Sequence, residues 1–281
     1  MGVRILERVQ LSDLVVKLVF DAPLIARKRK AGQFVILRIH EEGERVPLTI
    51  ADADAEAGTL TVIFQVVGKS TRHLAELQVG DEILDLVGPL GQPTHIEKFG
   101  TVCCIGGGVG VAPVHPIMQA MKAAGNEVIA ILGARNKDLI IMEDEFRKCA
   151  DEVMLTTDDG SAGFHGFLNQ ALEETYLKPG RKIDLVVAIG PVPMMRAITE
   201  MTAKYKVPTV VSLNAVMVDG TGMCGGCRVS VGGEVKYVCV DGPEFDGHQV
   251  DFKSLTERQR TYIEQEKSSD EHYCRCLKGG N

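Results

Sequence analysis

The 281-residue chain lacks the features that mark several large classes of protein. No uninterrupted apolar run reaches the ~18 residues that a membrane-spanning helix needs. Basic residues are in the minority, 31 against 38 acidic ones, and the formal net charge is −7, whereas nucleic-acid binders depend on a basic surface. No collagen-like period and no low-complexity segment occurs. We therefore expect a protein that binds neither membranes nor nucleic acid.

What the chain does contain is enough apolar sequence to fold, together with eight cysteines. With 45% hydrophobic and 25% charged residues it can bury a core, and its length favours two domains, or two plus an appendage. A secreted disulfide-rich domain would be short and would open with an apolar signal segment, but this chain opens MGVRILERVQ. We therefore predict a cytoplasmic protein whose cysteines are thiols.

The first two zones of the chain differ in their apolar pattern. Residues 1–100 carry short alternating apolar segments between glycine and proline turns, which predicts an antiparallel β-barrel. One helix, at 72–77, interrupts it, with Ser70 and Thr71 as possible caps. Residues 101–214 alternate apolar strands with helices, which predicts a parallel-sheet α/β domain of the nucleotide-binding type.

The third zone, residues 215–281, is glycine-rich and carries cysteines before it ends in a charged segment. It is too small to bury a core of its own, so we expect a metal centre to organise it. A C-x-C pair near its end, Cys274 and Cys276, has no predicted role.

The strongest chemical signal lies in this third zone. Asp219, Cys224, Cys227 and Cys239 follow the spacing D-x4-C-x2-C-x11-C. A plant-type [2Fe–2S] site has the spacing C-x4-C-x2-C and a more distant Cys, so the match is close, with Asp219 in place of the first cysteine. Glycines between these residues allow backbone amides to point at cluster sulfurs. We predict a [2Fe–2S] cluster with one carboxylate and three thiolate ligands.

Two other interpretations of the cysteines are open. A zinc site could take the three cysteines with His248 as its fourth ligand, although the spacing from Cys239 to His248 is not that of a zinc finger. A redox dithiol at Cys224 and Cys227 would normally begin a helix, which the two glycines between them disfavour.

Glycine-rich turns at strand ends predict a nucleotide site. The sequence GGGVGVAP at 106–113 joins the first strand of the α/β domain to a helix, where glycine lets the backbone approach a pyrophosphate and the helix start offers free amides. Arg135 and the sequence GPVPMM at 190–195 follow two further strands, at the edge where open α/β sheets bind ligands. The strict G-x-G-x-x-G register is absent, so the first turn by itself also fits tight strand-to-helix packing.

The barrel contributes two further motifs. The sequence RVPLT at 45–49 ends a strand, and VGKST at 67–71 begins the helix. The second can hold phosphate through backbone amides, Lys69 and the hydroxyls of Ser70 and Thr71. Each motif by itself also fits an ordinary strand end or helix cap.

Together, these motifs resemble the ferredoxin–NADP reductase superfamily. Within it, the chain is similar to the electron-transfer subunits of dihydroorotate dehydrogenases and, more closely, to the small (alpha) subunits of NADH-dependent reduced ferredoxin:NADP oxidoreductases, also described as sulfide dehydrogenase subunits. The resemblance covers essentially the whole chain. Its most specific mark is Asp219, because the dihydroorotate subunits have Cys at that position, whereas the second group holds its cluster with one aspartate and three cysteines.

The resemblance implies FAD in the barrel, NAD(H) on the α/β domain and a [2Fe–2S] cluster in the third zone. One departure is that Leu48 replaces the usual Tyr and that Arg45 stands one residue earlier than the superfamily Arg. Arg135 could hold a 2′-phosphate, whereas Asp158 and Asp159 would repel one, so the choice between NAD and NADP is open. No catalytic acid or base is implied, because the cofactors supply the chemistry.

The implied cofactor-binding residues of the barrel are Arg45, Pro47, Leu48, Thr49, Gln65, Gly68, Ser70 and Thr71. Those of the α/β domain are Gly106, Gly107, Gly108, Val109, Gly110, Ala112, Pro113, Arg135, Asp158, Gly190, Pro191, Met194 and Met195.

In function, the resemblance implies an oxidoreductase subunit that moves electrons between NAD(H), FAD and the cluster, in either direction. It also implies a heterodimer with a large flavoprotein subunit that carries [4Fe–4S] clusters, and through that subunit ferredoxin, NADP(H) and flavin-based bifurcation. The alternatives are an electron-transfer subunit of dihydroorotate dehydrogenase and a zinc-binding, nucleotide-sensing module.

Overall fold

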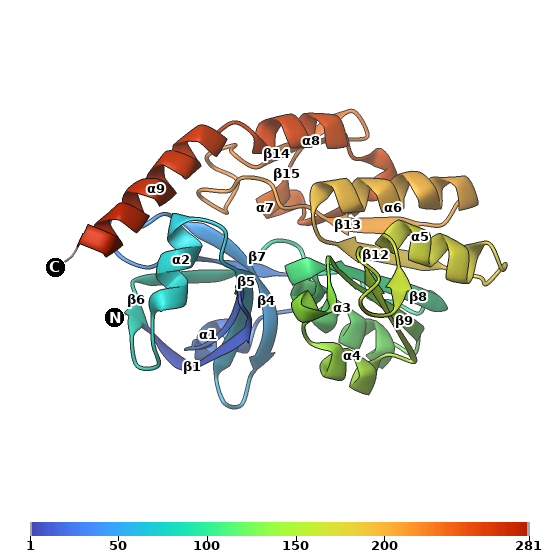
Figure 1. Cartoon of the computed structure of the whole chain (residues 1–281), viewed down its shortest axis with the longest axis horizontal. Coiled ribbons are helices and arrows are strands. Elements are labelled where there is room, and N and C mark those ends of the chain that lie inside the picture. Colours follow the sequence, from blue (N-terminus) through green and yellow to red (C-terminus); the bar gives the residue numbers. More distant parts are fainter. Residues whose placement is uncertain (1, 280–281) are drawn as a thin grey trace.

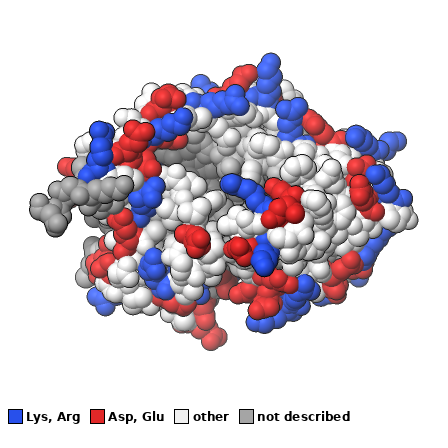
Figure 2. Space-filling model, viewed as in Figure 1, with Lys and Arg blue, Asp and Glu red and all other residues white. Residues whose placement is uncertain are grey.

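A barrel and an α/β domain lie side by side, and a helical arm runs along the top of both (Figure 1). The structure is a computed structural model that describes residues 2–279, with side chains as far as Arg275. The Cys276 side chain lies outside this described part. Among the described residues, no helix combines the length and apolar character needed to span a membrane. Figure 2 shows acidic and basic side chains intermixed over the face viewed.

The barrel is a seven-stranded antiparallel sheet in the order β6-β1-β2-β5-β4-β3-β7, as the alternating pattern of residues 1–100 predicts. Alternate side chains of its strands, such as Leu18, Val35 and Leu60, are fully buried inside it. Helix α2 rests on this interior through Leu74, which is 1% exposed. The elements are β1 (Val3–Ser12), β2 (Val15–Asp21), α1 (Pro23–Ala26), β3 (Phe34–Arg38), β4 (Val46–Asp54), β5 (Thr59–Gln65), α2 (Lys69–Glu76), β6 (Glu82–Ile83) and β7 (Asp85–Leu90).

The α/β domain is a seven-stranded sheet in the order β11-β10-β9-β8-β12-β13-β16, parallel except for β16. Helices α3 and α4 cover one face and α5 and α6 the other, so the central strands are apolar on both sides. Cys103 and Cys104 point to opposite faces of β8 and are both fully buried, so they pack in the core as small apolar side chains.

The elements of this domain are β8 (Thr101–Gly107), η1 (Gly108–Gly110), α3 (Val111–Ala123), β9 (Glu127–Ala134), η2 (Lys137–Leu139), α4 (Glu143–Cys149), β10 (Glu152–Thr157), β11 (Phe164–His165), α5 (Leu168–Leu172), η3 (Glu173–Leu177), β12 (Leu185–Ile189), α6 (Val192–Tyr205) and β13 (Thr209–Ser212).

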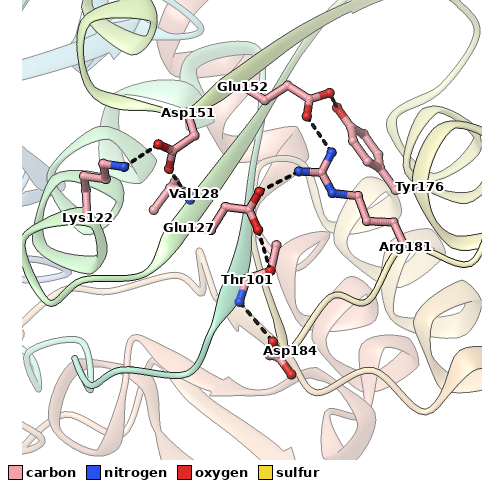
Figure 3. Close-up of polar contacts among 9 residues, drawn as sticks. All are labelled: Thr101, Lys122, Glu127, Val128, Asp151, Glu152, Tyr176, Arg181 and Asp184. Carbon is pink, nitrogen blue, oxygen red and sulfur yellow. Dashed lines mark hydrogen bonds and ion pairs between the residues drawn. The ribbon is translucent and has the colours of Figure 1, made fainter.

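Ion pairs hold the amino ends of these strands together (Figure 3). Arg181 donates to Glu127, the first residue of β9, at 2.8 Å and to Glu152, the first residue of β10, at 2.6 Å. The Tyr176 hydroxyl also donates to Glu152, at 2.6 Å. This edge is therefore closed by side chains of the domain itself, and the carboxyl edge is the one left for ligands.

The third zone shares its core with the α/β domain. Val229, Val238 and Leu255 belong to the same buried cluster as the α6 residue Ile198, and β16 pairs with β13. Apolar packing on its neighbour therefore stabilises a segment too small for a core of its own. Its elements are β14 (Arg228–Val231), β15 (Glu234–Tyr237), α7 (Val238–Asp241), β16 (Glu244–Asp246), η4 (Gly247–Gln249), α8 (Phe252–Gln259) and α9 (Ile263–Gly279).

Helix α9 returns from this segment to the barrel and lies beside α2 (Figure 1). Both carboxylate oxygens of Asp270 accept hydrogen bonds from Arg72, at 3.1 and 3.2 Å. The Tyr273 hydroxyl donates to Glu76 at 2.7 Å. The end of the chain is thus tied to the helix that begins at the predicted phosphate-binding hydroxyls.

Candidate cofactor sites

Two cavities, of about 510 and 570 Å³, open at the carboxyl edge of the α/β sheet. The first, here called the barrel cavity, lies where the barrel, the α/β domain and the start of the third zone meet. The second, here called the sheet cavity, lies over the ends of the parallel strands. Five residues line both cavities: Gln65, Gly107, Gly108, Val109 and Pro191. Two ligands bound in these cavities would therefore meet at this shared wall.

The barrel cavity collects most of the predicted barrel residues. It is lined by Pro47, Leu48 and Thr49 from β4, by Gln65 at the end of β5 and by Thr71 from α2. It is also lined by a second predicted set from the α/β domain, namely Gly107, Gly108, Val109, Gly110, Pro113, Gly190 and Pro191. A half-open, mostly apolar space bounded by a few polar groups fits a flat aromatic ring system such as a flavin.

The sheet cavity collects the charged candidates. Arg135 and Asp158 both line it, together with Met194 and the shared residues of the glycine turn. No side chain lies within 4 Å of the position that a Cβ would take on Gly108, whose φ is +57°. The turn therefore presents bare backbone to the cavity, which fits close approach of a dinucleotide pyrophosphate.

Several predicted residues line neither cavity. Met195 and Ala112 are fully buried in the core, because successive helix residues point in different directions and only their neighbours Met194 and Pro113 face the cavities. Gly106 lies beneath the turn, against the backbone of Val111. For these residues, the glycine-rich and helix-start motifs identified the segment but not the side chains that reach the ligand space.

At the start of α2, the predicted phosphate hydroxyls already have partners. The Ser70 hydroxyl donates to the carboxylate of Glu44, and the Thr71 hydroxyl oxygen accepts from the amides of Val67 and Gly68 at 3.0 and 3.2 Å. Ser70 and Gly68 lie beside the barrel cavity rather than on its wall. Glu44 would have to release the Ser70 hydroxyl before Ser70 could donate to a phosphate, so this role of Ser70 stays a prediction.

The four predicted metal ligands lie in and near one loop, residues 218–227, here called the cysteine loop. Cys227 and Cys239 are buried with their sulfurs 3.1 Å apart, whereas Cys224 is exposed. One carboxylate oxygen of Asp219 accepts from the Thr221 hydroxyl at 2.7 Å and its amide at 2.9 Å. Within the described residues, three or more His, Cys, Asp or Glu side chains do not converge as a preformed metal site.

Hydrogen bonds within the cysteine loop nevertheless favour the deprotonated forms of its exposed ligand side chains, Asp219 and Cys224. Hydrogen bonds from the Thr221 hydroxyl and amide lower the pKa of Asp219. Hydrogen bonds from the amides of Gly226 and Asp219 lower the pKa of the Cys224 thiol. Burial, reinforced by Cys227, raises the pKa of Cys239 to about 12, so a metal would have to displace its proton. Three thiols, one carboxylate and inward-pointing amides fit an iron–sulfur cluster.

Two other predicted site residues, His248 and Arg45, make contacts away from the proposed metal and cofactor positions. His248, the possible fourth zinc ligand, has Nε2 3.2 Å from the Thr202 hydroxyl on α6 and is not grouped with the cysteines. Arg45 lines neither cavity, since its guanidinium donates to the carbonyls of Val218 and Asp219 at 2.8 and 3.4 Å. Its contact with a cofactor stays a prediction.

Sequence reasoning missed residues that line the cavities without any motif. Phe34, Asn214 and Pro243 line the barrel cavity, and Phe167 and Asn169 line the sheet cavity. The chain brings them together from separate zones, so no local spacing marks them.

Comparison with known proteins agrees with this geometry. The family model described as the iron–sulfur cluster binding domain of dihydroorotate dehydrogenase B matches residues 214–251, and the oxidoreductase NAD-binding domain matches residues 104–200. The chain is 47% identical to a dihydroorotate dehydrogenase B (NAD(+)) electron transfer subunit homolog of Thermotoga maritima, over 96% of this chain and 94% of that one. It is 36% identical to the electron transfer subunit of Desulforamulus reducens, over 82% and 90%.

A solved structure of an NADH-dependent reduced ferredoxin-NADP oxidoreductase, studied for flavin-based electron bifurcation, is also similar. It superimposes with a TM-score of 0.92 at 46% identity, covering 98% of both chains. The predicted fold class, a barrel followed by an α/β domain and an iron–sulfur segment, is confirmed.

Proposed function

The chain belongs to the family of dihydroorotate dehydrogenase B electron transfer subunits and their homologues, and we propose that it passes electrons between NAD(H) and a [2Fe–2S] cluster through FAD. It is an oxidoreductase subunit with an NAD-binding domain and an iron–sulfur domain. In this proposal NAD(H) occupies the sheet cavity, FAD the barrel cavity, and the cluster the cysteine loop.

The observation that carries the proposal is the continuity of the three sites. The barrel and sheet cavities share a wall of five residues, so two bound ring systems would meet there. Asn214, Ala215 and Met217 line the barrel cavity, and the cysteine loop begins at Val218. A third cavity, of about 310 Å³, is lined by both Ala215 and Cys224. A few residues therefore separate the flavin position from the cluster position.

The residues of this chain act by binding and orienting. Bound FAD would exchange hydride with NAD(H) and single electrons with the cluster, which is the chemistry that a flavin supplies. The bare backbone of Gly108 would let the dinucleotide lie close to the shared wall. Pro47 and Leu48 would give a bound flavin ring an apolar surface to lie on. No side chain has to act as a general acid or base.

We propose that a larger subunit accepts electrons from the cluster or donates electrons to it. Three apolar side chains on or beside the cysteine loop are exposed to solvent: Met223 at 87%, Val218 at 54% and Val240 at 39%. An exposed apolar surface of this kind fits protein association next to an electron-transfer centre. We propose a large flavoprotein subunit with [4Fe–4S] clusters, which in turn serves ferredoxin and NADP(H). Asp219 favours this partner over a dihydroorotate-oxidising subunit.

An absorption spectrum of the anaerobically purified protein tests the cofactors. We expect flavin bands, a broad iron–sulfur shoulder that bleaches with NADH, and two irons and two sulfides per chain. Cys224→Ser should lose the shoulder and the iron but keep the flavin, while Cys149→Ser, in α4 away from the loop, should keep all three. A colourless protein, or a Cys224→Ser variant with the wild-type iron spectrum, would contradict the proposal.

Copurification from native cells tests the partner. A copurified subunit that reduces ferredoxin or NADP supports the proposed heterodimer, whereas one that oxidises dihydroorotate would replace it with the alternative. A double substitution of Met223 and Val218 to Ser should weaken the association without loss of the cluster spectrum, since both side chains are exposed.

A further inference from the structure

Three arginine side chains donate to carbonyls of the cysteine loop: Arg258 binds that of Gly226 at 2.9 Å, and Arg45 and Arg228 bind three others. Arg45, which precedes β4, donates from Nε to the carbonyl oxygen of Val218 at 2.8 Å and from Nη2 to that of Asp219 at 3.4 Å. Arg228, the first residue of β14, donates from Nη1 to the carbonyl oxygen of Gly225 at 3.3 Å. The two guanidinium groups therefore bind carbonyls before and after the exposed Cys224.

One of these carbonyls, that of Gly225, belongs to a peptide group whose amide donates to the Cys224 sulfur, and that of Val218 belongs to a peptide group whose amide also affects the Cys224 thiol. In a trans peptide, the C=O of one residue and the N–H of the next point in opposite directions. The carbonyl of Gly225 is therefore opposite the amide of Gly226, which donates to Sγ of Cys224 at 3.4 Å. The carbonyl of Val218 is likewise opposite the amide of Asp219, and hydrogen bonds from the amides of Gly226 and Asp219 lower the pKa of the Cys224 thiol.

We propose that Arg45 and Arg228 are positioning residues for the cluster, which fix two peptide groups so that their amides stay on the Cys224 sulfur and raise the reduction potential. The inference rests on the proposed function, because it takes the cysteine loop as the cluster site. A reduced cluster carries one more electron than the oxidised one, so hydrogen bonds to its sulfur ligands stabilise the reduced form more. A guanidinium on the carbonyl end also polarises the peptide and strengthens the amide hydrogen bond.

The positions of the two side chains favour this role over a purely structural one. Within the described part of the chain, neither arginine has a carboxylate at ion-pair distance; both guanidinium groups donate to loop carbonyls, and the charge of Arg45 also acts on the Asp219 carboxylate. Arg45 is half-buried and directly precedes the four residues of β4 that line the barrel cavity. The strand beside the proposed flavin is therefore joined by one side chain to the loop that holds the cluster.

The test measures the cluster potential of the purified holoprotein by a redox titration followed by electron paramagnetic resonance. Arg45→Gln and Arg228→Gln should retain iron, sulfide and FAD, but the ratio of reduced to oxidised cluster at the wild-type midpoint should fall about three- to tenfold. A tenfold change corresponds to about 59 mV for a one-electron couple. Arg147→Gln removes an equal charge from an exposed residue of α4 and should leave the potential unchanged.

A conservative variant separates positioning from charge. Arg45→Lys keeps the charge but lacks the planar fork that reaches two carbonyls, so we expect it to share at least half of the Arg45→Gln shift. Full wild-type potential in Arg45→Lys or Arg45→Gln overturns the inference. So does a loss of FAD from Arg45→Gln with an unchanged cluster, because Arg45 would then be a flavin ligand.

Two results distinguish a failure of this inference from misfolding of a variant and from a failure of the proposed function. If Arg45→Gln does not fold, Arg228→Gln alone decides, since it tests the second peptide group independently. A wild-type protein without any cluster would overturn the proposed function and the inference with it, whereas an intact wild-type cluster with unshifted variants overturns only the inference.

Discussion

Replacing Gly110 with alanine tests whether the turn between β8 and α3 must be bare backbone. The φ of Gly110 is −62°, so alanine can adopt the same backbone and the obstacle is space. An added Cβ would lie 2.8 Å from the carbonyl carbon of Ile189, 2.9 Å from Cα of Gly190, and closer still to the Ile189 carbonyl oxygen. These are main-chain atoms at the end of β12, which cannot rotate aside as a flexible side chain would.

The start of α3 must therefore move away from β12. Inserting a methyl group into a packed interior costs about 2 kcal/mol, which for a chain of this size lowers Tm by about 3–4 °C. Gly110 lines the barrel cavity, and the turn before it lines both cavities. We expect the same displacement to weaken NADH binding about tenfold, equivalent to about 1.4 kcal/mol.

Thermal unfolding and calorimetric titration with NADH measure the two effects. Gly125→Ala is the matched control, because Gly125 has a φ of +84° but nothing within 4 Å of an added Cβ. It should cost about 1 kcal/mol through backbone strain and leave NADH affinity unchanged. Wild-type NADH affinity in Gly110→Ala would refute the assignment of this turn to the nucleotide, and a wild-type Tm would refute the packing argument.

Three further predictions concern the barrel and its contacts. Asp270→Ala removes the paired hydrogen bonds to Arg72 and should accelerate FAD loss about two- to fivefold. This is the effect expected from a partly exposed ion pair worth about 0.5–1 kcal/mol. The rate of FAD loss is measured by flavin fluorescence after dilution of the holoprotein. Leu74→Ala empties a buried site under α2 and should cost about 2–5 kcal/mol in thermal unfolding, with reduced flavin content. Burial raises the pKa of Glu244 from 4.5 to about 7, although a hydrogen bond from Thr94 lowers it, so the folded state favours the neutral carboxyl. The free energy of unfolding should therefore fall as pH rises from about 4.5 to about 7. In denaturant titrations, Glu244→Gln should remove that decline.

Each of these has a control and an opposite result. Leu24→Ala, at a residue that is 73% exposed, should leave Tm unchanged, and an equal loss in both leucine variants would contradict the burial argument. FAD release from Asp270→Ala at the wild-type rate would show that the contact of α9 with α2 does not stabilise bound FAD. A pH profile that is the same with and without Glu244 would assign the decline to another group.

The two domains could be predicted from the sequence because their signals are local. Alternating apolar residues define a barrel strand and continuous apolar runs define a strand covered on both faces, so the sequence predicts a barrel followed by an α/β domain, and the structure confirms this fold class. The glycine turn at 106–113 and the spacing of the cysteines are equally local, since each lies within one short segment. The relation of the third zone to its neighbour was not visible in this way, because β16 pairs with β13 across more than thirty residues of chain.

Individual side chains were harder to assign than segments. Met194 and Met195 are adjacent in sequence, but one lines the sheet cavity and the other is fully buried, since a helix turns by about 100° per residue. Arg45 is the first residue of the predicted flavin motif at 45–49, but its long side chain reaches a loop more than 170 positions further along the chain. The direction in which each side chain points determines which site it reaches, and residue spacing along the sequence does not specify that direction.

The sequence by itself determined the chemistry that this protein can hold: one carboxylate and three thiols at cluster spacing, bare backbone at a strand end, and hydroxyls at a helix start. These depend on residue type and short separations. The tertiary structure alone decided that the barrel and sheet cavities share a wall, that the cysteine loop begins at the edge of the first, and that arginines hold this loop from outside. Such relations join atoms from distant parts of the chain, and only packing of the three zones against one another sets the distances between them.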